Sequence, residues 1–243
     1  LINGRITKKT FNKWMWFSNF AKKIFNNFDL CLAASKESEE NLRKLGVKNV
    51  KNIGNIKFSE EIETDDLFDK NIQILKQKTF WCAASTHNGE EIICLKTHLN
   101  LKRIYNDLIT VIIPRHINRS MEINDLCKKY GLLSQILGNE ESIKDNSEII
   151  IINSFGTLSK FYNYSKSVFI GKSMIKKLHK VGGQNPIEAA KLGCKIYHGP
   201  YIYNFKEIYD FLKSYKISEE VYNDKELFEK LTNDFKNSKN NQN

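Results

Sequence analysis

Short apolar runs alternate with amphipathic segments along most of the chain. Runs rich in apolar and β-branched residues predict strands, at residues 29–34, 47–53, 79–84, 108–113, 148–153, 167–170 and 195–198. Apolar positions three and four residues apart predict helices, at residues 35–45, 70–77, 90–105, 121–130, 158–164, 187–192, 204–212 and 224–235. This alternation implies βαβ units, and therefore an α/β fold with a parallel sheet and helices on both faces.

Residues 10–28 predict one further helix, in which aromatic and basic residues are mixed. Its apolar stripe consists of Phe11, Trp14, Phe17, Phe20, Ile24 and Phe28, and Lys13, Lys22 and Lys23 lie among them. A basic aromatic helix can lie on an anionic membrane. Such a stripe more often packs into a core, and we expect it to do so here.

An acidic stretch at 59–69 indicates a boundary between two domains. We expect residues 1–58 to be the C-terminal portion of a first Rossmann-like domain and residues 59–78 to be a linker. A second Rossmann-like domain is expected at 79–235, and a disordered polar tail at 236–243. The chain begins with Leu1, within an apparent strand, so we expect it to be the downstream part of a longer protein.

The composition narrows the class of protein only slightly. The net charge of +10 suits nucleic acid, an anionic membrane surface or a phosphorylated substrate, but an AT-rich codon bias toward Lys, Asn and Ile explains part of it. The five cysteines have no CxxC spacing and lie mostly in apolar stretches, which is typical of reduced, buried thiols in a cytoplasmic protein. We find no signal peptide and no apolar run long enough to span a membrane.

The most informative stretch for function is 181–193. Gly182 and Gly183 allow a tight turn and a close approach to a ligand. Asn185 and Pro186 are typical of a helix start, and Glu188 then falls in the first turn, where its carboxylate can accept hydrogen bonds from hydroxyl groups. Together these features indicate a site for a phosphorylated sugar or nucleotide. The alternative is an ordinary joint between a loop and a helix.

Three further candidate loops each follow a predicted strand, where parallel sheets bind ligands. Their residues are Ser85, Thr86 and His87; Pro114, Arg115 and His116; and Phe155, Gly156 and Thr157. Arg115 could grip a phosphate or carboxylate with two hydrogen bonds. Lys57, after a glycine turn, could stabilise negative charge. Each feature alone is commonly structural, but four loops on one edge of a sheet favour a binding site. The histidines lack metal-site spacing and no Walker or GxSxG motif occurs, so we expect no metal and no cofactor.

The order and spacing of these motifs resemble the C-terminal part of the 3-deoxy-D-manno-octulosonic acid (Kdo) transferases, which are lipopolysaccharide enzymes of the GT-B fold. The matching segments are Asn3-Gly4-Arg5, Phe28-Asp29-Leu30, Ala34-Ser35, Gly54-Asn55-Ile56-Lys57-Phe58, Ala83-Ala84-Ser85-Thr86-His87, Gly89-Glu90-Glu91, Pro114-Arg115-His116, Gly182-Gly183-Gln184-Asn185-Pro186-Ile187-Glu188, Gly199-Pro200 and Asn204-Phe205. They run through nearly the whole chain.

The resemblance implies two Rossmann-like domains that face each other across a cleft, with the donor CMP-Kdo bound mainly by residues 79–235. By similarity, CMP contacts come from Pro114, Arg115, Phe155, Gly156, Thr157, Asn185, Pro186, Ile187 and Glu188. Glu188 would hold the ribose hydroxyls, Lys57 would stabilise the transition state, and Ser85, Thr86 and His87 would form a possible donor loop.

The implied reaction transfers Kdo from CMP-Kdo to a lipid A precursor, lipid IVA, with inversion at the anomeric carbon. It would take place at the cytoplasmic face of the bacterial inner membrane. The resemblance places the catalytic base and the membrane anchor upstream of this chain, so we expect the chain to be inactive alone.

Three positions depart from the family pattern. Thr157 replaces a frequent glutamate, Gln184 a frequent histidine and Ala189 a frequent proline. Two alternatives stay open: another GT-B nucleotide-sugar transferase or epimerase, and a non-catalytic basic module that binds a membrane or nucleic acid. Only residues 10–28 approach a nucleic-acid pattern, so we expect no nucleic acid partner.

Overall fold

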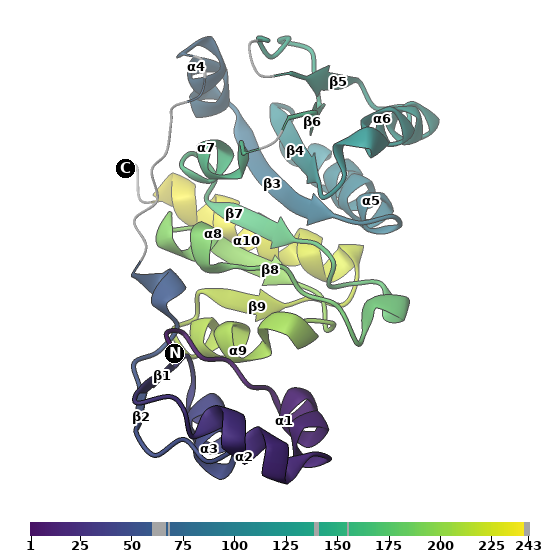
Figure 1. Ribbon diagram of the computed structural model, residues 1–243. Coiled ribbons are helices and arrows are strands. Elements are labelled where there is room, and N and C mark those ends of the chain that lie inside the picture. The colour runs from purple at the N-terminus through teal and green to yellow at the C-terminus, as the bar shows by residue number, and fades with distance from the viewer. Residues whose placement is uncertain (60–66, 68, 139–140, 155, 241–243) are drawn as a thin grey trace. The chain divides into compact units, whose positions relative to one another are not determined.

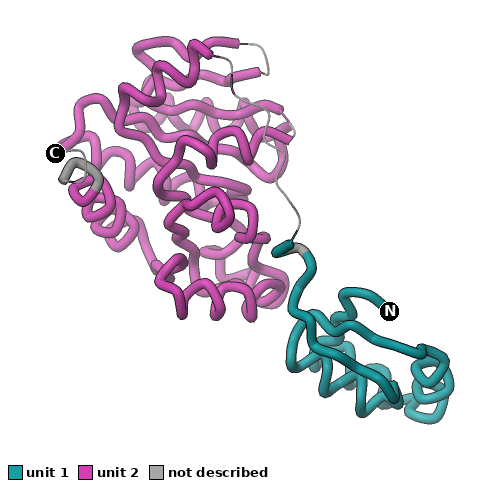
Figure 2. The backbone as a smooth tube through the Cα atoms, turned by 90° about the vertical axis from the view of Figure 1, so that its left-hand side faces the viewer, with its two compact units in different colours: residues 1–61 teal, residues 62–243 magenta. Residues whose placement is uncertain are grey.

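The computed structural model describes residues 1–59, 67, 69–138, 141–154 and 156–240, apart from the side chains of Lys57 and residues 238–240. The chain divides into two compact units, unit 1 at residues 1–61 and unit 2 at residues 62–243 (Figure 2). Each unit encloses its own cluster of buried apolar residues.

Unit 1 is built on two short parallel strands and the helix that connects them. These are β1 (Cys31–Ala33), α3 (Lys36–Lys44) and β2 (Val50–Asn52), followed by a short 3-10 helix, η1 (Ile56–Phe58). Ser35 caps α3, because its hydroxyl accepts a hydrogen bond from the Ser38 N–H at 3.1 Å. Gly4 forms a single parallel bridge with Ala33, so the first residues lie beside β1.

The stretch predicted as one helix at 10–28 forms two, α1 (Lys8–Met15) and α2 (Ser18–Phe25). Phe17 interrupts the helix with φ −122° and ψ 50°, and the interruption changes which face of the following helix turns inward. Ala21 and Phe25 are buried, and Phe25 packs edge to face against Trp14 at 5.2 Å. Phe17 and Phe20 are 68% and 60% exposed. The prediction that the whole stripe packs into the core was therefore wrong for these two residues.

Unit 2 contains a seven-stranded, entirely parallel sheet (Figure 1) with the order β5-β6-β4-β3-β7-β8-β9. The strands are β3 (Thr79–Thr86), β4 (Leu108–Pro114), β5 (Ser134–Leu137), β6 (Ile149–Ile152), β7 (Ser167–Ile170), β8 (Lys195–His198) and β9 (Ser218–Glu220). The predicted parallel α/β fold is confirmed. The two edge strands, β5 and β9, were not predicted, because polar residues such as Gln135 and Glu219 interrupt their apolar pattern.

Helices cover both faces of this sheet (Figure 1). They are α4 (Asp69–Gln77), α5 (Glu90–Lys102), α6 (Ser120–Lys129), α7 (Leu158–Tyr162), α8 (Ile187–Lys191), α9 (Lys206–Ser214) and α10 (Asp224–Asn240), with 3-10 turns η2 (Ile117–Arg119), η3 (Lys176–Leu178) and η4 (Tyr203–Phe205). Trp81 and Ala83 of β3 point into the cluster formed with α5, α6 and α10. Cys82, between them, points to the other face, where it lies near Ser165 and Cys194. α10 continues to Asn240, into the stretch predicted as a polar tail.

The strand order reverses between β3 and β7. From β3 the chain builds the sheet outward through β4 toward β5 and β6, and it then returns to place β7 on the other side of β3. Loops at the carboxyl ends of such a pair lead away from each other, which makes this position the usual ligand site of an open parallel sheet. The fold thus directs attention to the loops that follow β3 and β7.

We expect all five thiols to be protected from modification in the folded chain, because each cysteine is buried. Burial raises the pKa of Cys82 to about 12 and that of Cys127 to about 11, so little reactive thiolate forms at neutral pH. Ellman's reagent should modify essentially no thiol in buffer and all five in concentrated urea. Rapid labelling of several thiols in the folded chain would contradict the packing around β3 and α5.

Candidate functional site

The structure places the candidate loops of unit 2 along the carboxyl edge of the parallel sheet. They are residues 85–89 at the end of β3, 115–119 after β4, 153–154 and 156–157 after β6, 171–175 after β7 and 179–186 before α8. The loop after β7 was not among the sequence candidates. It lies at the strand reversal, directly beside the loop after β3.

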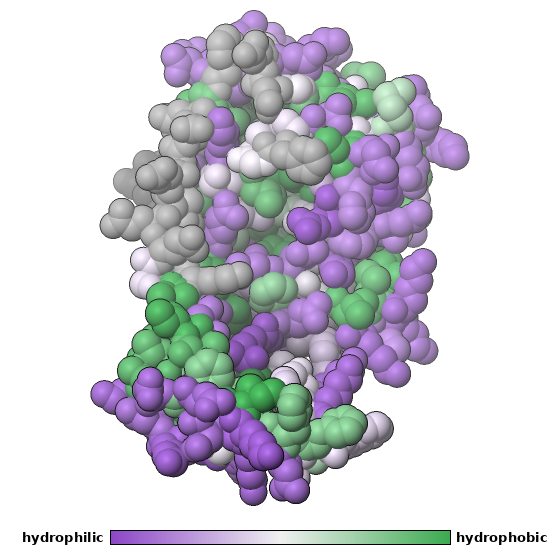
Figure 3. Space-filling model, in the orientation of Figure 1, coloured by the Kyte–Doolittle hydropathy of each residue, from purple (hydrophilic) through white to green (hydrophobic). Residues whose placement is uncertain are grey.

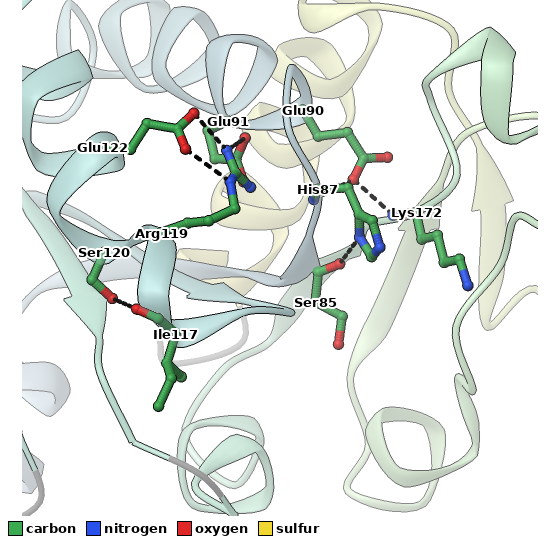
Figure 4. Close-up of polar contacts among 9 residues, drawn as sticks. All are labelled: Ser85, His87, Glu90, Glu91, Ile117, Arg119, Ser120, Glu122 and Lys172. Carbon is green, nitrogen blue, oxygen red and sulfur yellow. Dashed lines mark hydrogen bonds and ion pairs between the residues drawn. The ribbon is translucent and has the colours of Figure 1, made fainter.

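Glu90, at the start of α5, connects these two central loops. Its carboxylate is fully buried and accepts four backbone hydrogen bonds. Figure 4 shows Glu90 with two of the donor residues, His87 and Lys172. The N–H groups of His87 and Lys172 donate to Oε2 at 2.9 and 2.7 Å, and those of Ser173 and Met174 donate to Oε1 at 2.8 and 2.9 Å. Burial raises the pKa of the Glu90 carboxyl, and the four N–H donors oppose that rise.

The backbone around this carboxylate is shaped to admit it. A Cβ atom at Gly171 would lie 2.7 Å from Glu90 Oε2, so a larger residue there would displace the carboxylate. Ser85 forms a bulge at the end of β3, where the register with β4 shifts, and it has a left-handed φ of 55°. Lys172 has a similar φ of 58°. Two non-glycine residues thus adopt a costly conformation on either side of Glu90.

Glu91 forms the second connection, toward β4 and β6. The Arg119 guanidinium donates to both carboxylate oxygens of the buried Glu91, from Nη1 at 2.7 Å and from Nη2 at 3.2 Å (Figure 4). The next residue, Ser120, donates its hydroxyl to Asn153 Oδ1 at 3.3 Å, at the start of the loop after β6. Adjacent glutamates therefore hold the loops on both sides of β3.

These roles are hard to predict from the sequence. Two glutamates in the first turn of a helix commonly do no more than complement the helix dipole. One signal in the sequence could have indicated these roles. Glu90 and Glu91 lie between a buried strand and a largely apolar helix, and carboxylates that become buried there require specific hydrogen-bond donors.

The glycine loop packs against the protein itself. A Cβ atom at Gly182 would lie 2.1 Å from the carbonyl oxygen of Tyr201, and Gly183 has a φ of 90°. The Gly183 N–H donates to the Lys172 carbonyl at 2.7 Å, which joins this loop to the one after β7. These glycines are needed for close backbone packing. Their close approach to a ligand stays a prediction.

Glu188 projects from the first turn of α8, which begins at Ile187 as predicted and ends one residue earlier than predicted, at Lys191. Asn185 Oδ1 accepts the Ile187 N–H at 3.2 Å, so Asn185 orders the helix start as expected. Glu188 is half-buried. Burial raises the pKa of its carboxyl, and a hydrogen bond with Ser159 of α7 opposes the rise. Pro186 and Ile187 are themselves buried.

Arg115 and His116 are exposed at the end of β4, whereas Pro114 is buried within the strand. The Arg115 side chain makes no hydrogen bond or ion pair within the part of the chain that the structure describes. The His87 and His116 rings lie 5.7 Å apart, which brings the loops after β3 and β4 together. Burial lowers the pKa of His87, and the positive charge of Lys172 lowers it further, against the opposing hydrogen bond to the Ser85 carbonyl.

The remaining candidate residues make fewer contacts with the loops that Glu90 and Glu91 hold together. Thr157 is buried, with its hydroxyl 3.5 Å from that of Ser154, and Gly156 is exposed with a φ of 74°. Phe155 lies outside the described residues. Lys57 belongs to η1 of unit 1, and its side chain also lies outside them.

Within the described ranges, no group of three or more His, Cys, Asp or Glu side chains could hold a metal ion. The helices of the same ranges include none that is long and apolar enough to cross a membrane.

Comparisons with known proteins identify relatives of the whole chain. A family model described as 3-deoxy-D-manno-octulosonic-acid transferase (kdotransferase) matches residues 1–60. The 3-deoxy-D-manno-octulosonic acid transferase of Rickettsia prowazekii is 30% identical over 96% of this chain and 50% of its own length. The chain thus spans about half the length of the curated relatives it matches.

Solved structures share the fold. A crystal structure described as the C-terminal CMP-Kdo binding domain of WaaA from Acinetobacter baumannii superposes with a TM-score of 0.61 at 22% identity, over 69% of this chain and 88% of that one. A structure described as a putative UDP-N-acetylglucosamine 2-epimerase from Listeria monocytogenes superposes with a TM-score of 0.56 at 14% identity. This match covers 86% of this chain and 52% of that one. These likenesses support the GT-B type of fold. Family model, relatives and fold agree with the motifs, and the chain is a homologue of the 3-deoxy-D-manno-octulosonic acid transferases.

Proposed function

We propose that unit 2 is the donor-binding domain of a Kdo transferase and that it binds CMP-Kdo along the carboxyl edge of its sheet. The observation that carries this proposal is the placement of the family's motifs. Segments up to 103 residues apart in the chain, from Ser85 to Glu188, lie on one edge of one sheet. Glu90 and Glu91 hold the central loops in fixed positions, which favours a preformed ligand site.

Each candidate residue has a role that its chemistry supports. Arg115, exposed at the end of β4, would grip the CMP phosphate with its planar guanidinium. Glu188 would accept hydrogen bonds from the ribose hydroxyls. The remaining contacts would come from Pro114, Phe155, Gly156, Thr157, Asn185, Pro186 and Ile187, and the loop of Ser85, Thr86 and His87 would lie near the transferred sugar.

The proposed reaction moves Kdo to the glucosamine disaccharide of a lipid A precursor such as lipid IVA, with inversion at the anomeric carbon. Lys57 would stabilise the negative charge that develops on the departing CMP. The base that deprotonates the acceptor hydroxyl would come from outside residues 1–243. We therefore expect this chain to bind donor without completing the transfer.

The acceptor is a lipid, and the surface of unit 1 suits contact with an anionic membrane. Trp16 and Phe17 are exposed at the junction between α1 and α2, and Phe20 is exposed on α2. Apolar and polar residues lie side by side over this part of the surface (Figure 3). The two helices contain Lys8, Lys9, Lys13, Lys22 and Lys23 and no acidic residue. Exposed aromatics with a basic rim are typical of interfacial helices. We propose that unit 1 contacts the cytoplasmic face of the bacterial inner membrane.

A second candidate is another nucleotide-sugar enzyme of the same fold, such as a UDP-sugar epimerase. The fold likeness to the putative UDP-N-acetylglucosamine 2-epimerase supports it. The motifs favour the transferase. The two candidates differ in the nucleotide, so a preference for CMP over UDP would support the first and the reverse would support the second.

We expect the chain to bind CMP, and we expect Arg115→Ala and Glu188→Ala to weaken this binding. Loss of a charge-assisted hydrogen bond of about 1.5–3 kcal/mol corresponds to a roughly 10- to 100-fold rise in Kd. Isothermal titration calorimetry measures it. Arg103→Ala and Glu229→Ala are matched controls, because both residues are exposed and lie away from the carboxyl edge. Equal affinity in all four variants would contradict the proposed donor site.

We expect Glu90→Gln to weaken CMP binding and also to destabilise unit 2. The glutamine amide nitrogen cannot accept, so two of the four backbone N–H groups would lose their acceptor, at about 1–3 kcal/mol each. Urea unfolding should therefore show a loss of roughly 2–6 kcal/mol. The exposed Glu229→Gln serves as the control. A stability equal to that of the parent would show that this carboxylate does not hold the loops.

We expect the chain to bind vesicles that contain phosphatidylglycerol and to bind neutral phosphatidylcholine vesicles much less. Phe17→Ser with Phe20→Ser should reduce the bound fraction, because each buried aromatic side chain contributes about 1.5–3 kcal/mol. Sedimentation with vesicles measures this fraction. Tyr222→Ser, an exposed aromatic of unit 2, should leave it unchanged. Equal binding by the double variant and the parent would argue against contact through α1 and α2.

A further inference from the structure

Lys172 is the least expected residue at the strand reversal. It lies two residues after the end of β7, behind Gly171, and has a left-handed φ of 58°, a conformation that costs a side-chain-bearing residue about 1–2 kcal/mol. Among the described residues, four non-glycine positions have positive φ: Asn3, Ser85, Lys172 and Lys216. Two of the four, Ser85 and Lys172, lie at the ends of the adjacent strands β3 and β7.

The surrounding contacts hold the Lys172 backbone from both sides. Its N–H donates to Glu90 Oε2 at 2.7 Å, and its carbonyl accepts the Gly183 N–H at 2.7 Å. These bonds fix the residue between the loop after β3 and the glycine loop that leads to Glu188. Strain that the surroundings maintain in this way occurs preferentially at ligand sites.

This conformation directs the lysine side chain away from the buried carboxylate. Figure 4 shows the Lys172 and His87 side chains on the same side of Glu90. The Lys172 side chain points away from the Glu90 carboxylate, and its ammonium group lies at the far end. The ammonium has no hydrogen bond or ion pair within the described residues. Lys172 is only partly exposed and lies close enough to His87 to lower the pKa of that imidazole. The neighbouring imidazole is therefore mostly neutral at pH 7, and the lysine supplies the positive charge.

Lys172 and Arg115 stand on opposite sides of β3, at the ends of β7 and β4. Neighbouring strands lie about 4.8 Å apart, so the two strand ends are separated by roughly 10 Å. The long side chains of lysine and arginine can converge across this distance on one ligand that carries two neighbouring acidic groups. A nucleotide-linked sugar acid has such a pair, the phosphodiester and the sugar carboxylate.

We propose that Lys172 binds the carboxylate of the sugar acid while Arg115 binds the phosphate, so that Lys172 selects an acidic sugar over a neutral one. This inference rests on the proposed function of unit 2 as a CMP-Kdo site. It assigns Lys172 a part in sugar selection, separate from nucleotide binding.

Lys172→Asn tests the assignment by calorimetry with two probes, CMP and CMP-Kdo. Asparagine tolerates the left-handed conformation and removes the charge. Loss of one hydrogen bond to a charged group should weaken CMP-Kdo binding about 10- to 100-fold, whereas CMP affinity should change less than about 3-fold. Lys172→Gly, which favours positive φ, should behave the same way.

Lys216→Asn is a matched control. Lys216 has an almost identical φ of 59° but precedes β9 at the opposite edge of the sheet, so its replacement should leave both affinities unchanged. Unchanged CMP-Kdo affinity in the Lys172 variants, or an equal loss for CMP and CMP-Kdo, would overturn the inference and leave the nucleotide site intact. A parent chain that binds neither probe would overturn the proposed function together with it.

Discussion

The arrangement of the carboxyl edge depends on the buried carboxylate of Glu90. A carboxylate without water is tolerated only when donors surround it, and here four backbone N–H groups from two loops do so. Because both oxygens are engaged, neither the loop after β3 nor the loop after β7 can move without leaving buried polar groups unsatisfied. The adjacent Glu91 accepts two hydrogen bonds from Arg119 and so holds the loop that follows β4 in the same way. One dipeptide thus sets the positions of the loops on both sides of β3.

The sequence predicted the parallel α/β fold well because its central strands are continuous apolar runs, such as the four isoleucines at 149–152. The sequence pattern did not predict elements and residue roles that depend on contacts with distant parts of the chain. β9 has the sequence Ser-Glu-Glu and is a strand only because β8 offers it a partner. The role of Glu90 was equally hidden, since three of its donors lie 82 to 84 residues away. The interruption at Phe17 left no clear mark in the helical pattern of residues 10–28.

The glycine motif illustrates how a functional signature can be structural in its detail. Gly182 lies so close to the Tyr201 carbonyl oxygen that a side chain would not fit, and Gly183 has a positive φ and lies close to the backbone of Ile202. This packing brings Asn185 and Glu188 to the carboxyl edge, and the proposed ligand groups are on these following residues. The same distinction holds for Gly171, which makes room for Glu90. Motif glycines here indicate where the backbone must pack, and only indirectly where a ligand binds.

An imidazole and two basic side chains, those of His87, Arg115 and Lys172, belong to the loops around the strand reversal. Burial and the nearby Lys172 lower the pKa of His87, so this imidazole favours its neutral form and suits hydrogen bonding more than charge neutralisation. In the proposed donor site, positive charge facing the anionic ligand would then come from the side chains of Arg115 and Lys172. The uncharged imidazole of His87 would be free to orient a hydroxyl group of the bound sugar.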